Sequence, residues 1–221
     1  MKVTPPKFIV DNAIEGSPKI YSQSNEACVV MEYFHGEVGN LLDIGANDGE
    51  TFSNSRNLLQ LGWSGTLIEP SPKAFSKLLE LYGTGEKTTL LNIAISDATA
   101  TTTLHESGAH VLGGNDIALV STVVPAEMNR WRDVEFNNVQ VDTKRIDDAG
   151  LDKRYDFISI DCEGMDWVVL QQLNLTAMGC KCICVEHNSI MDLKLDIIGY
   201  CKQFGLETIL LSNAENIIIA K

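Results

Sequence analysis

Two short apolar segments that each end in polar residues constrain the fold of this chain most. The first, Leu41-Leu42, leads into LLDIGANDG, and the second, Leu67-Ile68, leads into TLIEPSP and ends at Glu69. Parallel strands that end in a glycine-bearing turn and in an acid are typical of nucleotide pockets. Glycine lets the backbone approach a ligand closely, and the carboxylate accepts hydrogen bonds from both ribose hydroxyls. The pair therefore predicts an α/β fold with a ligand site at the strand ends.

The glycine-bearing turn itself disfavours a dinucleotide. Dinucleotide folds place a pyrophosphate on bare backbone with the pattern GxGxxG, whereas Asn47 and Glu50 occupy the second and third glycine positions here. Asp43 and Asp48 add negative charge, and the turn carries no basic residue. A ligand with a ribose and a cationic amino-acid end suits the turn better. The pattern DxGxxxG resembles the first motif of methyltransferases that use S-adenosylmethionine (SAM).

Size and composition favour a single globular domain that binds neither membrane nor nucleic acid. The chain has 221 residues, of which 44% are hydrophobic, and its net charge is −13 with 17 basic residues. Phosphate backbones require clustered Lys and Arg, and the sequence shows no such cluster. No apolar run is long enough for a membrane span, and the N-terminal residues lack the apolar stretch of a signal peptide. We therefore expect a cytoplasmic protein.

Strands and helices alternate along most of the chain. This alternation implies a mostly parallel, doubly wound sheet, and the last two strands predict an antiparallel C-terminal hairpin in place of a further βαβ unit. The expected helices are 26–34, 51–61, 72–81 and 191–204, and the expected strands are 41–44, 66–69, 89–95, 155–161, 180–186, 206–211 and 215–220. The sequence thus predicts a seven-stranded sheet.

Two segments depart from this alternation. Residues 1–40 are predicted to form an irregular arm and a short helix that packs on a domain spanning 41–221. Residues 99 to about 142 are predicted to form an insertion with antiparallel strands and a short helix near 125–131, because the segment is rich in threonine and glycine. Insertions above the strand ends of α/β folds commonly form the substrate wall. A plain surface insertion is the alternative.

Among the tryptophan, histidine and cysteine residues, few are good candidates for a functional site. Trp131, which lies between Arg130 and Arg132, is the best candidate for stacking on a sugar, whereas core packing is expected of Trp63 and Trp167. In the insertion, solvation is the expected state of His105 and His110. Cys180, Cys182 and Cys184 alternate along an expected strand, which would place them on one face as buried thiols.

Several stretches together resemble one family, the FkbM-type SAM-dependent methyltransferases. The stretches occur in order over about residues 21–221: YSQSNEACVVMEYF, LLDIGANDGETFSNSRNL, LGWSGTLIEPSPKAF, NIAISD, KRIDDAG, IDCEGMDWVVL and VEHN. The resemblance implies a Rossmann-like class I methyltransferase fold. It also implies O-methylation of a sugar, a glycan precursor or a hydroxylated natural product. Two departures, the shorter acid Asp166 in EGMDW and a single acid in Ser24-Asn25-Glu26, leave cofactor binding unaffected.

The resemblance also implies roles for individual residues around the cofactor. Those implied to surround the methionine part of SAM are Asp43, Gly45, Asn47 and Gly49. Glu69 would hold the ribose hydroxyls, and the residues implied to flank the adenine are Asn92, Ala94 and Ile95. Asp161 would face the transferring methyl group. Open parallel sheets bind ligands beyond the carboxyl ends of their strands, which agrees with this placement.

Catalysis needs an aligned oxygen and a way to remove its proton. One hypothesis is a Mg²⁺ ion held by Asp161, Glu186 and Asn188 (or His187), as acids and an amide do in methyltransferases of the catechol O-methyltransferase type. The competing hypothesis is metal-free catalysis with Asp161 or His187 as general base. The third is that Glu186 only caps a helix or pairs with a lysine.

The sequence leaves several points open. An NAD-type Rossmann oxidoreductase and a non-catalytic SAM-binding module are the alternatives to the methyltransferase, although the missing GxGxxG and the terminal hairpin argue against the first. The acceptor is a small molecule or a glycan that the sequence does not identify. The oligomeric state is not fixed either, and a homodimer is one candidate.

Overall fold

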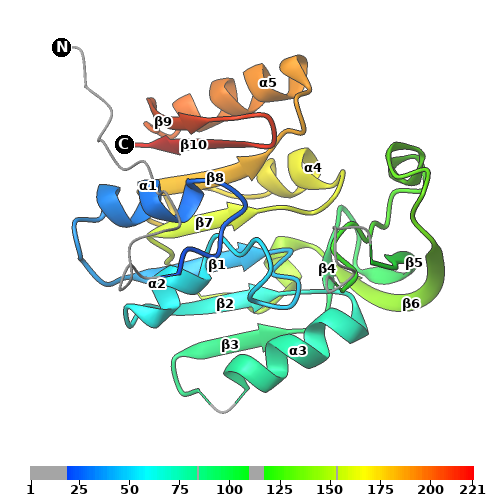
Figure 1. Ribbon diagram of the computed structural model, residues 1–221. Helices are drawn as coiled ribbons and strands as arrows, with labels where there is room; N and C mark the ends of the chain where they lie inside the picture. Colours follow the sequence, from blue (N-terminus) through cyan, green and yellow to red (C-terminus); the bar gives the residue numbers. More distant parts are fainter. Residues whose placement is uncertain (1–18, 84, 110–116, 153) are drawn as a thin grey trace.

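A seven-stranded sheet forms the centre of the protein (Figure 1). The computed structural model describes residues 19–83, 85–109, 117–152 and 154–221. In spatial order the strands are β3 (Thr88–Leu91), β2 (Ser64–Ile68), β1 (Asn40–Ile44), β7 (Phe157–Ile160), β8 (Cys182–Glu186), β10 (Asn216–Ala220) and β9 (Thr208–Ser212). All pairs are parallel except those of β10, which runs antiparallel to β8 and β9. The predicted parallel sheet with a C-terminal antiparallel hairpin is confirmed.

Helices cover both faces of the sheet. The helices are α1 (Glu26–Tyr33), α2 (Arg56–Gln60), α3 (Pro72–Tyr82), α4 (Asp166–Leu170) and α5 (Met191–Lys202). One core cluster joins α4 and α5 to the inward residues of the central strands, and a second joins α1 and α2 to the opposite face. Within the described residues, no helix is long and apolar enough to cross a membrane.

Helix α1 is fixed to the C-terminal hairpin by a buried acid. Glu26 is fully buried, and its carboxylate accepts hydrogen bonds from the side-chain amides of Asn213 (2.7 Å) and Asn216 (3.3 Å). The backbone N–H of Ser24 donates to the same carboxylate at 2.8 Å. A buried carboxylate is tolerated when several donors satisfy it. The short helix therefore packs on the sheet, although it precedes the first strand.

The helix predicted over 51–61 is shorter in the structure, and that prediction was wrong at its N-terminal end. Asp48 accepts hydrogen bonds from the backbone N–H groups of Glu50 (2.8 Å) and Thr51 (2.7 Å), and from the Thr51 hydroxyl. Such local bonds from an aspartate compete with helical ones. Phe52 then adopts a left-handed conformation (φ 55°), which no helix accommodates. The segment before α2 is therefore a loop, and it lines the cavity described below.

The strand predicted over 89–95 is divided between two sheets. β3 ends at Leu91, and β4 (Ala94–Ile95) joins a separate three-stranded sheet with β6 (Phe136–Lys144) and β5 (Ala100–Ser107). The Asn92 side chain donates to the carbonyl groups of Glu69 (2.8 Å) and Pro70 (3.1 Å), which ties the crossing point to the end of β2. β5 and β6 pair antiparallel, so the predicted antiparallel insertion is confirmed. Figure 1 shows this smaller sheet at one side of the main sheet.

The other predictions for the core hold with one exception. Trp63 packs edge-on against Phe34 at 4.7 Å, and Trp167 packs edge-on against Tyr200 at 5.9 Å, so both are packing residues. The three cysteines do not share one face. Cys182 and Cys184 pack in the cluster with α1 and α2, whereas Cys180 precedes β8 and belongs to the opposite cluster. Strand alternation does not extend to Cys180 because it lies outside the strand.

Candidate active site

The candidate site lies where the order of strands reverses. β2 and β3 lie on one side of β1, whereas β7, which comes later in the chain, lies on the other. In open α/β sheets, ligands bind at such a switch point, outside the carboxyl ends of the strands. A cavity occupies this position, and its lining includes Asp43, Gly45, Asn47, Glu69, Ala94, Ile95 and Asp161. Seven residues implicated from the sequence thus surround one cavity.

Gly45 permits the ends of β1 and β7 to approach each other. Its φ is +90°, and a Cβ atom added there would lie 1.7 Å from the carbonyl oxygen of Asp161. The backbone N–H groups of Gly45 and Ala46 both donate to the carbonyl of Ile68, at 2.9 and 3.0 Å. No side chain fits between these backbones. The glycine therefore joins β1, β2 and β7 at the floor of the cavity.

Two buried acids line the cavity and are held by local hydrogen bonds. The Glu69 carboxylate accepts hydrogen bonds from the backbone N–H groups of Asn47 (2.9 Å) and Ser71 (2.7 Å). Asp43 accepts one from the hydroxyl of Ser55. Burial raises the pKa of Glu69 to about 7 and that of Asp43 to about 6. Both carboxylates have fixed orientations and remaining acceptor positions for a ligand.

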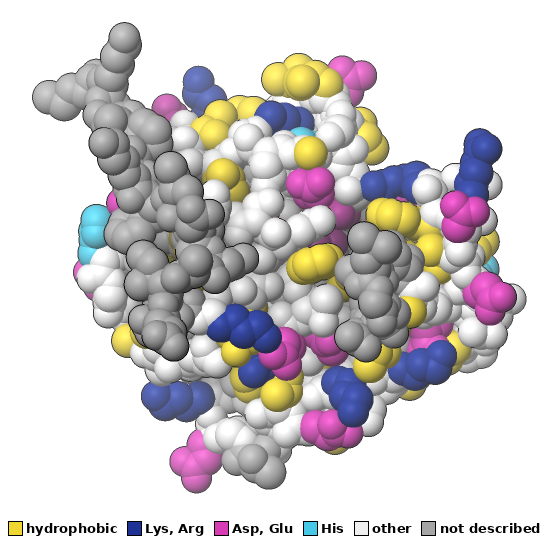
Figure 2. Space-filling model, viewed as in Figure 1, with side chains coloured by type: hydrophobic (Ala, Val, Ile, Leu, Met, Phe, Trp, Pro, Cys, Tyr) yellow, Lys and Arg dark blue, Asp and Glu magenta, His cyan; other side chains and the backbone are white. Residues whose placement is uncertain are grey.

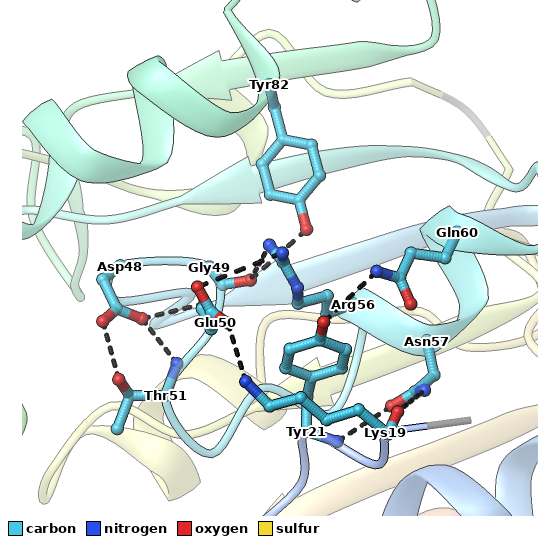
Figure 3. A network of polar contacts seen from close by, with 10 residues as sticks. All are labelled: Lys19, Tyr21, Asp48, Gly49, Glu50, Thr51, Arg56, Asn57, Gln60 and Tyr82. Carbon is cyan, nitrogen blue, oxygen red and sulfur yellow. Dashed lines mark hydrogen bonds and ion pairs between the residues drawn. The ribbon is translucent and has the colours of Figure 1, made fainter. Parts of the chain in front are cut away.

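The glycine-bearing loop is braced from outside the cavity (Figure 3). The Arg56 guanidinium donates to the carbonyl oxygen of Gly49 at 3.5 Å, and the Tyr82 hydroxyl donates to the same oxygen at 3.3 Å. Arg56 also lies 4.4 Å from the ring centroid of Tyr21. A Cβ atom on Gly49 would lie 2.6 Å from a methyl group of Leu78 in α3. Gly49 therefore lets the loop pack on α3, and it does not line the cavity.

Asn92 likewise lies behind the cavity wall. Ile93, Ala94 and Ile95 line the cavity, whereas Asn92 holds the end of β2 through the bonds given above. Asn47 adopts a left-handed conformation (φ 48°), and its amide nitrogen donates to the carbonyl of Ile117 in the insertion at 2.8 Å. The insertion thus closes over the glycine-bearing loop.

A second cavity adjoins the first and shares Asp161 with it. Phe52, Leu119 and Glu163 also line both cavities. The lining of the second cavity includes Arg130, Trp131, Glu186, Asn188 and Glu215. Leu119, Val120, Arg130 and Trp131 come from the segment predicted to form the substrate wall. The structure therefore places Trp131 and Arg130 where a molecule beside the first cavity would lie.

Three acids meet at the boundary of the two cavities. Asp161 and Glu163 follow β7, Glu186 ends β8, and each offers an oxygen within 4.8 Å of those of the other two. Desolvation, followed by repulsion from neighbouring acids, raises the pKa of Asp161 to about 8 and that of Glu163 to about 9. The same causes raise the pKa of Glu186 well above its ordinary value. Glu163 was not among the ligands predicted from the sequence, because the strand ends at this turn and the i, i+2 spacing from Asp161 therefore left the geometry open.

The turn that carries these acids is fixed by its own hydrogen bonds. Asp166 accepts hydrogen bonds from the backbone N–H groups of Cys162 (2.8 Å) and Gly164 (3.1 Å). The Thr122 hydroxyl of the insertion donates to the carbonyl of Glu163 at 2.7 Å. Asp166 therefore stabilises the turn.

The described histidines lie outside both cavity linings. His187 is 3% exposed, burial lowers its pKa, and no described residue bonds to either ring nitrogen. His105 is on β5, where its Nδ1 lies 2.8 Å from the side-chain oxygen of Asn138. His110 lies outside the described residues.

Comparisons with known proteins agree with this geometry. Residues 43–206 match the model of the methyltransferase FkbM domain. The chain belongs to the FkbM methyltransferase family. The matched residues run from Asp43 at the glycine-bearing turn to the end of α5, and they include the whole insertion.

Two relatives illustrate the family. The chain is 31% identical over 134 residues to the 2-O-methyltransferase NoeI of Sinorhizobium fredii (strain NBRC 101917 / NGR234). That match covers 57% of this chain and 54% of NoeI, so the chain spans about half the length of this curated relative. The crystal structure of an FkbM methyltransferase from Methylobacillus flagellatus KT matches with a TM-score of 0.53 and 14% identity, over 83% of this chain and 44% of that one. The likeness between the structures supports the class I methyltransferase fold.

Proposed function

We propose that this protein transfers a methyl group from SAM to a hydroxyl oxygen of a sugar, a glycan precursor or a hydroxylated natural product. The observation that carries the proposal is the position of Asp161, which lines both cavities. A cofactor in the first cavity and an acceptor in the second would meet at this carboxylate. The 2-O-methyltransferase activity in the name of NoeI supports an oxygen acceptor.

The first cavity has hydrogen-bond acceptors that suit SAM. Glu69 presents carboxylate oxygens whose remaining lone pairs suit two ribose hydroxyls, and Asp43 offers negative charge for a cationic amino-acid end. Asn47 presents a buried side-chain oxygen that no described residue satisfies. Ala94 and Ile95 add an apolar wall. No Lys or Arg is among the described residues of this lining, which disfavours the pyrophosphate of NAD.

The residues between the cavities would align the acceptor and remove its proton. SAM, when bound, supplies a methyl group on a good neutral leaving group, so alignment and proton removal are the protein's tasks. Asp161 is the proposed proton acceptor, because its pKa of about 8 makes it a stronger base than an ordinary carboxylate. His187 is the weaker candidate, because it lies outside both linings. Mg²⁺ is the competing proposal: the acids at the ends of β7 and β8 would bind the ion, and Asp161 would then be a ligand of the ion instead of the proton acceptor.

The second cavity suits a neutral hydroxylated acceptor. Four acids line it (Asp161, Glu163, Glu186 and Glu215) against one described cation, Arg130, whose guanidinium is paired with Glu127 at 2.8 Å. Anionic acceptors would be repelled there. Trp131, whose ring centroid lies 5.5 Å from the Arg130 guanidinium, lines this cavity and is the proposed aromatic contact for a sugar. On the face shown in Figure 2, Lys and Arg side chains are dispersed among acidic ones, so no basic patch invites a nucleic acid.

Calorimetric titration with S-adenosylhomocysteine (SAH), the demethylated product of SAM, tests the first part of the proposal. The wild-type protein should bind SAH, and Glu69→Ala should weaken the affinity at least about tenfold, which corresponds to 1.4 kcal/mol. Glu80→Ala is the matched control, because Glu80 is an exposed acid of α3 paired only with Lys77. That variant loses the same charge and should bind SAH as the wild type does.

The outcomes separate the alternatives. SAH binding that is lost in Glu69→Ala alone justifies a screen of sugar acceptors with labelled SAM, in which methylated product distinguishes an enzyme from a binding module. No binding of SAH by the folded wild-type protein would refute the proposal. A titration with NAD on the same sample would then test the oxidoreductase.

A further inference from the structure

We propose that Asp161, Glu163 and Glu186 bind one divalent metal ion of the Mg²⁺ or Mn²⁺ class at the boundary of the two cavities. The three side chains come from the ends of neighbouring strands, β7 and β8. Each offers an oxygen, and these oxygens lie within 4.8 Å of one another. Two oxygens on one ion are separated by at most twice the metal–oxygen distance, about 4.2 Å for Mg²⁺ and up to about 5 Å for Ca²⁺. As it stands the set fits around an ion of the size of Ca²⁺, and the smaller Mg²⁺ would draw the side chains together by up to about 0.6 Å.

Two of these acids have no partner among the described residues that would explain their burial. Glu163 is 8% exposed and Glu186 is 6% exposed. The Oε2 atom of each is buried and receives no hydrogen bond from any described residue. Buried carboxylates are normally paired or bound to a metal, because an unpaired buried charge is costly. Since both lie in the same cluster as Asp161, one ligand would satisfy all three.

No described side chain forms an ion pair with these three acids, although the positive charge of Arg130 lies near enough to act on Glu163 and Glu186. Among the ion pairs of the described residues, none involves Asp161, Glu163 or Glu186. Arg130 lines the same cavity, but its guanidinium bonds Glu127. The alternative, a helix cap or lysine pair at Glu186, has no support among the described contacts.

The donor set defines the class of ion. All three ligands are carboxylate oxygens, which hard cations prefer, and no described cysteine or histidine belongs to the cluster. Three protein ligands leave coordination positions open toward the second cavity, which the same residues line. An acceptor hydroxyl could fill one of them and become more acidic there. Asn188 lines this cavity as well and is available as a further oxygen ligand.

This assignment predicts direct binding that does not depend on activity. The metal-free protein should be titrated with Mn²⁺, and the electron paramagnetic resonance signal of free Mn²⁺ should be used to monitor binding. The titration should show one strong site, for which Mg²⁺ competes. Glu163→Gln and Glu186→Gln should each weaken Mn²⁺ binding by about tenfold or more, since even outer-shell partners of metal ligands contribute 10–100-fold. Glu215→Gln is the matched control, because Glu215 lines the same cavity but does not belong to the cluster.

Thermal unfolding of the same proteins guards against misfolded variants. Both glutamine variants remove a repelling charge, so without metal they should melt at or above the temperature of the wild type. Mn²⁺ should raise the melting temperature of the wild type and of Glu215→Gln but not that of the other two variants. Absence of a strong Mn²⁺ site in the folded wild type would overturn the assignment. So would binding that survives in Glu186→Gln, because the ion would then lie elsewhere on this acidic surface.

The role of the ion in methyl transfer rests on the function proposed above, but its binding does not. SAH calorimetry on the same samples keeps the two apart. SAH binding without Mn²⁺ binding would overturn the metal site and leave the methyltransferase intact. Mn²⁺ binding without SAH binding would support the metal site and refute the proposed function.

Discussion

Replacing Gly45 by alanine should destabilise the protein more than replacing another glycine with the same backbone conformation. Gly45 has a φ of +90°, and an alanine in this left-handed conformation destabilises the fold by about 1–2 kcal/mol. Its Cβ atom would also lie 1.7 Å from the carbonyl oxygen of Asp161, and the backbone must move to relieve this clash. Overpacking of this kind adds about 1–3 kcal/mol, so the expected total is about 2–5 kcal/mol.

Gly36→Ala provides the matched control. Gly36 has φ +82°, and nothing lies within 4 Å of its added Cβ atom, so only the conformational penalty of about 1–2 kcal/mol applies. Urea unfolding followed by circular dichroism gives both free energies of unfolding. Calorimetry should also show weaker SAH binding for Gly45→Ala and unchanged binding for Gly36→Ala. Equal stability of the two variants would refute the close approach of β1 and β7 on which the site rests.

Three further predictions follow from single contacts. SAH affinity should rise by up to about tenfold from pH 6 to pH 8, because the Glu69 carboxyl, with a pKa of about 7, must lose its proton to accept two hydroxyls. Calorimetry should show a clearly smaller rise for Glu69→Gln, in which Asp43, with a pKa of about 6, still titrates, and a flat wild-type profile would contradict the idea. Ser71→Ala should lower the free energy of unfolding by about 2 kcal/mol, because Ser71 caps α3 and its hydroxyl donates to the buried Glu106 at 2.6 Å. An unchanged urea unfolding curve would count against this prediction. Once an acceptor is found, Trp131→Ala should raise its KM several-fold with unchanged SAH affinity, as steady-state kinetics and calorimetry would show.

The fold was predictable because its signals are local and repeated. Each strand of the main sheet is an apolar run bounded by turn residues, and α3 has both a serine cap at Ser71 and a proline at its first position. The same signals misled at 51–61, because they describe propensity and not competing side-chain bonds. Asp48 ends the preceding turn with three hydrogen bonds, which spacing alone does not reveal.

The site was predictable where a residue's role depends on strand order, and not where it depends on packing. Asp43 lies near the end of β1, and Glu69 and Asp161 follow β2 and β7. The order of these strands in the sheet can be inferred, so the convergence of the three acids could be expected. Gly49 and Asn92 lie behind the cavity wall because of contacts with α3 and with the end of β2. Such contacts join distant segments, and no spacing in the sequence encodes them.

The backbone conformation after three neighbouring strands also supports ligand binding at the two cavities. Asn47 after β1, Glu163 after β7 and Asn188 after β8 all adopt left-handed conformations, with φ of 48°, 46° and 48°. Non-glycine residues rarely do so, because the conformation costs free energy that the surroundings must offset. Each of the three lines at least one of the two adjoining cavities. A strained turn repeated at adjacent strands, with each strained side chain facing a cavity, is better explained by ligand binding than by stability, which glycine would serve at less cost.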